Sequence, residues 1–220
     1  MDTKSVSVMA GPERTGKIRI GVLGGTFDPI HNGHLHVARH LREKLALDEV
    51  HLVTAARPPH KLANVLGAAN RHEMVEMACA EEEGLIASAV ELENGFSFTV
   101  DTIRHMRANH PAGADNLELF FITSAEYVDP ENPHHILTWT EAEEFLSLVT
   151  LVVTPRGHCD ENKTRAWVEA LGLEGVRVED VPALHVTSGM VKKALREGDL
   201  SDHMMPEAVA RLIKTRGYYR

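Results

Sequence analysis

Residues 24–35 read GGTFDPIHNGHL and follow the apolar run IRIGVL at residues 18–23. The β-branched residues of that run predict a buried first strand. A helical pattern begins at Asn32 or Gly33 and continues to Leu45. One face of this helix is made of Leu35, Ala38, Leu41 and Leu45. Residues 24–35 are therefore predicted to turn from a buried strand into an amphipathic helix.

Strands and helices alternate along the rest of the chain. Further strands are predicted at residues 50–55, 85–91, 117–123, 148–154 and 176–181. Helices are predicted at residues 70–82, 99–109, 139–146, 164–171, 188–197 and 206–216, and a surface loop at residues 129–135. Such alternation is typical of a parallel sheet covered on both faces. We expect an α/β fold, a Rossmann-like open parallel sheet, in a single domain over residues 18–220 that ends in helices.

Composition narrows the class of protein. The 220 residues carry a formal net charge of −9, from 23 basic and 32 acidic side chains, which is unlike a general nucleic-acid binder. No run approaches the roughly 20 apolar residues that span a bilayer, so no membrane partner is expected. Residues 1–17 have no apolar core of a signal peptide and are expected to be a flexible extension. Only Cys79 and Cys159 are present, so a reducing, cytoplasmic location is expected.

The turn itself has the properties of a phosphate site. Gly24 and Gly25 let the backbone approach a ligand closely, because neither residue has a Cβ. Backbone N–H groups near residues 25–27 and the positive end of the following helix can then face phosphate oxygens. The string is neither G-x-G-x-x-G nor G-x-x-x-x-G-K-[ST]. In an open α/β sheet this turn lies where ligands bind, beyond the carboxyl ends of the strands.

His31 and His34 are three residues apart at the start of the helix, so they are expected on one face. Two imidazoles beside a phosphate can donate hydrogen bonds to the charge that develops during phosphoryl-type transfer. A zinc site is the weaker interpretation, because H-N-G-H lacks the glutamate of H-E-x-x-H, and we predict no protein-held metal. His36 and His40 lie farther along the helix and are expected to be solvated or packed.

Residues 24–34 resemble the nucleotidyltransferase superfamily motif, whose core is [HT]-x-G-H, and the longer string G-G-T-F-D-P-I-H-x-G-H resembles the bacterial nicotinate-nucleotide adenylyltransferases. The resemblance extends over nearly the whole chain from about Lys17. Further matching segments are PPHK at residues 58–61, Arg71 with Met74, GFSFTVDTI at residues 95–103, residues 120–126 with Trp139, residues 186–192, and GYY at residues 217–219. The resemblance implies the nucleotidyltransferase α/β phosphodiesterase type of fold. It also implies transfer of AMP from ATP to nicotinate mononucleotide, with release of pyrophosphate, in NAD biosynthesis.

The resemblance implies these roles residue by residue. The ATP-binding residues would be Gly24, Gly25, Thr26, Phe27, His31, His34, Thr187, Ser188 and Lys192. The residues on the acceptor side would be Lys61, Thr99, Glu126 and Trp139, and the catalytic residues His34, His31 and Lys61. Mg²⁺ is expected with ATP, held by phosphates and water. Thr99 can equally be a helix N-cap, and Trp139 can equally be a packed core residue.

Three positions depart from the family pattern. Ser124-Ala125-Glu126 stands where the family has G-x-D, Gly189 where a threonine is usual, and Lys192 where arginine is usual. These departures leave alternatives open: another acceptor (nicotinamide mononucleotide or phosphopantetheine), or a non-catalytic nucleotide-binding paralogue. An RNA-linked role is disfavoured by the acidic charge. Association into a homo-oligomer is also left open.

Overall fold

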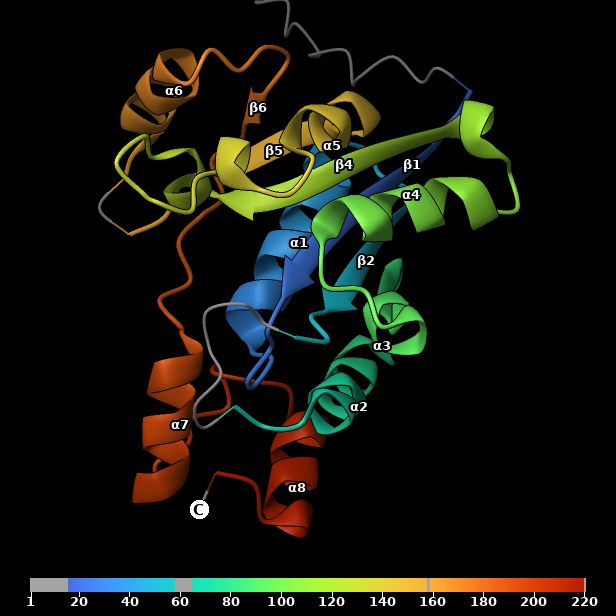
Figure 1. The fold of residues 1–220 in the computed structure, drawn as a ribbon. Helices are drawn as coiled ribbons and strands as arrows, with labels where there is room; N and C mark the ends of the chain where they lie inside the picture. Colours follow the sequence, from blue (N-terminus) through green and yellow to red (C-terminus); the bar gives the residue numbers. More distant parts are fainter. Residues whose placement is uncertain (1–15, 58–64, 158, 220) are drawn as a thin grey trace, which may run out of the picture.

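A six-stranded sheet, with every strand pairing parallel, forms the middle layer of the molecule (Figure 1). The computed structural model describes residues 16–57, 65–157 and 159–219. The expected extension at residues 1–17 therefore lies almost wholly outside the described residues. The strands are β1 (Ile18–Gly25), β2 (Glu49–Thr54), β3 (Leu85–Ser88), β4 (Leu117–Ser124), β5 (Thr150–Thr154) and β6 (Arg177–Val178). Their order in space is β3-β2-β1-β4-β5-β6.

Helices cover both faces of this sheet, as the alternating pattern predicted. They are α1 (Asn32–Lys44), α2 (Ala68–Cys79), α3 (Val90–Asn94), α4 (Thr99–Asn109), α5 (Ala142–Leu148), α6 (Glu161–Ala170), α7 (Ser188–Glu197) and α8 (Glu207–Arg216). Short 3₁₀ turns lie at Ala114–Asn116, Ala125–Val128 and Ile136–Thr138. One buried cluster joins the sheet to α1, α2, α7 and α8, and a second joins its other face to α3, α4, α5 and α6. None of the described helices is long and apolar enough to cross a membrane.

The strand order places the turn after β1 at the switch point of the sheet. The chain moves outward from β1 to β2 and β3, then returns to place β4 on the other side of β1. Because the two crossovers leave in opposite directions, a crevice opens beyond the carboxyl ends of β1 and β4. In Figure 1, α7 and α8 lie together at the bottom of the view, on the side toward which β1 points.

Three predicted elements are corrected by the structure. The strand predicted at residues 85–91 ends at Ser88, and Glu91 lies in α3, which begins at the buried Val90. The helix predicted from Trp139 begins only at Ala142, because Glu141 adopts a left-handed conformation with φ of 53°. The strand predicted at residues 176–181 pairs with β5 only at Arg177 and Val178. The predicted surface loop at residues 129–135 contains no helix or strand.

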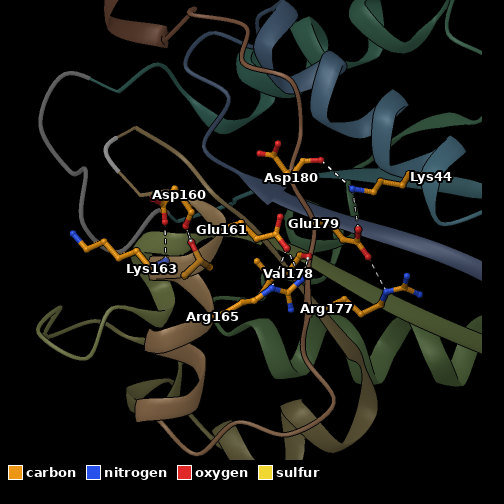
Figure 2. A network of polar contacts seen from close by, with 10 residues as sticks. Lys44, Asp160, Glu161, Lys163, Arg165, Arg177, Val178, Glu179 and Asp180 are labelled. Carbon is orange, nitrogen blue, oxygen red and sulfur yellow. Dashed lines mark hydrogen bonds and ion pairs between the residues drawn. The ribbon is translucent and has the colours of Figure 1, made fainter.

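Charged side chains anchor the segment that leaves β6 (Figure 2). Lys44 of α1 donates to the carbonyl of Asp180 at 3.1 Å and pairs with the Glu179 carboxylate at 3.1 Å. Arg177 donates to the other oxygen of Glu179 at 2.9 Å, and Arg165 of α6 donates to the Val178 carbonyl at 3.3 Å. The N–H of Glu179 still donates to the Val153 carbonyl of β5 at 3.0 Å, and beyond this residue the chain leaves the sheet and runs on to α7.

Candidate active site

A cleft of about 1800 Å³ opens beyond the carboxyl ends of β1, β4 and β5. Most of the residues predicted for the site line it: Gly24, Gly25, Thr26, Phe27, His31, His34, Thr99, Glu126, Trp139, Thr187, Ser188 and Lys192. The structure therefore brings together segments that are up to 168 residues apart, from Gly24 to Lys192 (192 − 24). The predicted catalytic residue Lys61, and the whole PPHK segment at residues 58–61, lie outside the described residues.

The two glycines at the end of β1 differ in their surroundings. A Cβ on Gly24 would meet nothing within 4 Å, so this residue presents open backbone to the cleft. A Cβ on Gly25 would lie 2.8 Å from the Phe27 ring. Phe27 is 2% exposed and has a φ of 48°, a backbone conformation in which a side chain is strained. Gly25 is thus required by the packing of the turn, whereas Gly24 leaves room for a ligand.

His31 lies at the N-cap of α1 and is buried, with 2% exposure. Burial and the positive charge of Arg156 lower the pKa of this imidazole from 6.5 to about 4, so the ring is neutral at physiological pH. Its Nδ1 atom is buried and has no hydrogen-bond partner among the described residues. A Cβ on Gly33 would lie 3.0 Å from this ring, so the glycine of H-N-G-H makes space for it.

His34 is held by its neighbours in one orientation. The backbone N–H of His31 donates to Nδ1 of His34 at 3.3 Å, and the two imidazoles are stacked with ring centroids 3.7 Å apart. The Phe27 ring also contacts the His34 ring, in an edge-to-face arrangement with ring centroids 5.0 Å apart. Because Nδ1 accepts a hydrogen bond, the proton of the neutral ring is on Nε2. Nε2 is therefore the atom through which His34 can donate to a ligand.

Hydrogen bonds and an ion pair connect the start of α7 to the turn after β1. The Thr187 hydroxyl accepts the N–H of Met190 at 3.2 Å as the N-cap of α7, and the Ser188 hydroxyl donates to the Pro29 carbonyl at 3.0 Å. The Lys192 ammonium pairs with the Asp28 carboxylate. Both hydroxyls predicted to face phosphate thus make hydrogen bonds within the protein.

Aromatic rings line the opposite part of the cleft. Trp139 packs against Tyr127, Phe121 and Phe145, with ring centroids 5.3, 6.0 and 5.7 Å away, and its Nε1 donates to the His134 carbonyl at 3.1 Å. Half-buried, it is both a core residue and part of the cleft wall.

Thr99 and Glu126 complete this side of the cleft. Thr99 is the first residue of α4, and Phe98 is the N-cap, so the interpretation of Thr99 as the cap is wrong. Glu126 is exposed, and its carbonyl accepts the Asn132 side-chain amide at 2.6 Å.

Arg71 is a residue of the site whose function the sequence did not indicate. It is 1% exposed, and its guanidinium donates to the carbonyls of Thr26, Ala55 and Leu66 at 2.5, 2.7 and 2.8 Å. It therefore ties the turn after β1 to the segments after β2. The R-x-x-M likeness marked this arginine, yet only the fold shows which carbonyls it satisfies.

Two further residues line the cleft without having been predicted to bind a ligand. Glu91 accepts the N–H of Ala56 at 3.1 Å and the Thr102 hydroxyl at 3.2 Å, and burial raises the pKa of its carboxyl group. Arg156 is exposed, lines the cleft and adds positive charge near His31. Among the described residues no group of three or more His, Cys, Asp or Glu side chains is arranged to hold a metal ion.

Comparisons with known proteins agree with this geometry. Residues 22–202 match the model of the cytidylyltransferase-like family. A probable nicotinate-nucleotide adenylyltransferase of Thermus thermophilus is 39% identical over 206 residues, covering 92% of this chain and 100% of the relative. One of Desulfitobacterium hafniense is 34% identical, covering 92% and 96%. A Plasmodium falciparum nicotinic acid mononucleotide adenylyltransferase, solved with NaAD, has the same fold, with a TM-score of 0.69 at 16% identity over 92% of this chain and 97% of that one.

Proposed function

Because the chain belongs to the nicotinate-nucleotide adenylyltransferases of the cytidylyltransferase-like family, we propose that it transfers AMP from ATP to nicotinate mononucleotide. The products are nicotinate adenine dinucleotide, the precursor of NAD, and pyrophosphate. The observation that carries the proposal is the stacked pair of His31 and His34 at the switch point of the sheet, beside the open backbone of Gly24. Phosphate groups bind at such helix N-termini.

The reaction needs little from the protein beyond positioning and charge stabilisation. An oxygen of the acceptor phosphate attacks the α-phosphorus of ATP, the bond from that phosphorus to the bridging oxygen breaks, and pyrophosphate leaves. A phosphate monoester is already anionic at neutral pH, so no general base is required. The Nε2–H of His34 donates to an oxygen of the α-phosphate as negative charge develops there.

His31 supports this step in a different way. Its neutral, buried ring forms the surface on which His34 stacks, and its backbone N–H sets the tautomer of His34. The two histidines therefore have different roles: His34 stabilises the negative charge on the α-phosphate, and His31 orients His34.

The two nucleotides are expected at opposite ends of the cleft. ATP phosphates would lie between Gly24, the N-terminus of α1 and the Lys192 ammonium. The acceptor base would lie against Trp139, whose exposed part offers a flat face to a flat ring. Thr99 and Glu126 would face the acceptor, and Lys61 would neutralise phosphate charge.

Mg²⁺ is proposed to enter with ATP as part of that substrate. The carboxylates nearest the turn are already engaged, since Asp28 pairs with Lys192 and Glu91 accepts two hydrogen bonds. The side chains described in the cleft fit an ion whose ligands are phosphate oxygens and water, the arrangement that Mg²⁺ prefers beside nucleotides. The ion would neutralise triphosphate charge.

An acceptor panel tests the proposed function. Purified protein with ATP and Mg²⁺ is given nicotinate mononucleotide, nicotinamide mononucleotide or phosphopantetheine, and pyrophosphate release is followed. Release that is fastest with nicotinate mononucleotide is expected. Faster release with another acceptor assigns that acceptor instead, and no release with any of them, despite ATP binding, assigns a non-catalytic nucleotide-binding role. A cytoplasmic location and the assembly of copies of the chain stay predictions.

A further inference from the structure

Asp28, inside the turn after β1, is a buried carboxylate that binds residues from distant parts of the chain. It is 6% exposed. One of its oxygens pairs with the Lys192 ammonium of α7. Its other oxygen accepts the Tyr219 hydroxyl at 2.8 Å and the N–H of Leu66 at 3.3 Å. Because both oxygens are occupied, the carboxylate is fixed in one orientation.

Tyr219 touches both members of the Asp28–Lys192 pair. Its hydroxyl donates to Asp28, and the Lys192 ammonium lies 5.2 Å from the centre of its ring, within the range of a cation–π contact. Burial and the nearby Asp28 charge raise the pKa of the Tyr219 phenol, so the hydroxyl keeps its proton and remains a donor.

Lys192 lines the cleft, and its side chain is 24% exposed. An ammonium group has three N–H donors, of which the contact with Asp28 uses one. The remaining donors can therefore reach an anion in the cleft while the nitrogen stays anchored. A lysine has a flexible stem of four carbons, so the direction of its charge depends on such anchoring contacts.

We propose that Tyr219 is a positioning residue for ATP: its hydroxyl orients Asp28, its ring supports the ammonium, and together they aim Lys192 at the triphosphate. This inference rests on the proposed function, since it takes the anion to be the phosphate chain of ATP. Asp28 acts as the link between Tyr219 and Lys192 and does not itself contact the anion.

A purely structural role for Tyr219 makes a different prediction. Tyr219 also packs against the core cluster that contains α8, so its loss could weaken the fold alone. In that case removing the hydroxyl would lower stability without changing ATP affinity, and its effect would be the same whether or not Lys192 is present. A double-mutant cycle separates the two roles.

The test measures the dissociation constant of a non-hydrolysable ATP analogue by calorimetry, with KM values for ATP and acceptor and a thermal melt beside it. Tyr219→Phe is expected to weaken analogue binding about fivefold, the scale of losing one ordinary hydrogen bond. KM for the acceptor should change less than about twofold, because the acceptor lies at the other end of the cleft. In a Lys192→Ala background, Tyr219→Phe should have no further effect on binding.

Matched variants make the result decisive. Tyr218→Phe, at the adjacent position, is the control and should bind the analogue like the wild type. Asp28→Asn keeps the shape of the side chain and should reproduce the weaker binding and its dependence on Lys192. A Tyr219→Phe effect that persists in the Lys192→Ala background, or equals that of Tyr218→Phe, overturns the proposal. Analogue binding needs no acceptor, so a wrong acceptor assignment leaves this test intact.

Discussion

The backbone N–H of His31 donates to Nδ1 of His34 at 3.3 Å, so the ring proton of His34 is on Nε2. We expect His34→Ala to lower kcat at least about 100-fold, the scale of losing one preorganised donor to a developing oxyanion. The measurement is pyrophosphate release at saturating substrates. His40→Ala, on the same helix and outside the cleft lining, is the control and should keep near-normal kcat. Equal activity in both variants would remove His34 from the mechanism.

The buried His31 makes stability depend on pH. Its pKa is about 4 in the folded protein and 6.5 in the unfolded chain, so between these values the unfolded chain binds more protons. Stability is therefore lost as the pH falls from about 7 to 4, by about 3 kcal/mol from this one group.

Urea unfolding of the wild type and of His31→Asn, at both ends of this range, measures the effect. Asparagine does not titrate and is a good N-cap. The variant should lose about 3 kcal/mol less than the wild type on acidification. Parallel losses in the two proteins would mean that His31 titrates normally.

The two adjacent glycines give opposite predictions. Gly25→Ala places a Cβ against the buried Phe27 ring and should lower the free energy of unfolding by about 1–3 kcal/mol, the usual cost of overpacking. Gly24→Ala meets open space, so its stability should stay within about 0.5 kcal/mol of the wild type. Its new methyl group enters the cleft and should raise KM for ATP. Denaturant unfolding and steady-state kinetics on both variants check this, and the reverse pattern would refute the assignment of Gly24 to the ligand.

Arg71 is predicted to be the residue on which the shape of the turn depends most. Arg71→Ala removes donors from three carbonyls in a buried region and should lower the free energy of unfolding by about 3 kcal/mol or more. Arg211→Ala removes an exposed arginine paired with Glu207 and should cost less than about 0.5 kcal/mol. Urea titrations of both variants decide, and a similar small cost for each would contradict the prediction.

The fold could be predicted from the sequence because, in most elements, the local pattern of apolar residues indicates the same structure that packing in the core requires. The helices predicted at residues 99–109 and 188–197 have the observed bounds of α4 and α7. Errors arose where one local pattern fits two structures. Val90 continues an apolar run and is also the buried start of α3, so the run alone could not end the strand. Val176 and Val178 alternate with polar residues as in a strand, and Val181 made the run look longer, but only Arg177 and Val178 pair with β5.

The site was predictable where its residues are contiguous in sequence. Gly24, His31 and His34 lie within one turn and one helix start, and the cleft contains all three. The residues that hold this turn come from elsewhere: Arg71 in α2 bonds the Thr26 carbonyl, and Tyr219 beyond α8 bonds Asp28, while the charge of Arg156 after β5 acts on His31. No periodicity or spacing connects such distant positions, so only the three-dimensional structure shows them.

Asp28 and Tyr219 are joined across 191 positions, and this separation bears on how the protein is made. Closing so long a loop is entropically costly and slow, whereas α1 and the pairing of β1 with β2 need only short loops. During synthesis, the ribosome has to release residue 219 before the turn at Asp28 acquires its final partner. A nascent chain can therefore have its sheet and both histidines in place before Tyr219 reaches Asp28. The ordered geometry of the site, and with it the activity, would then form last.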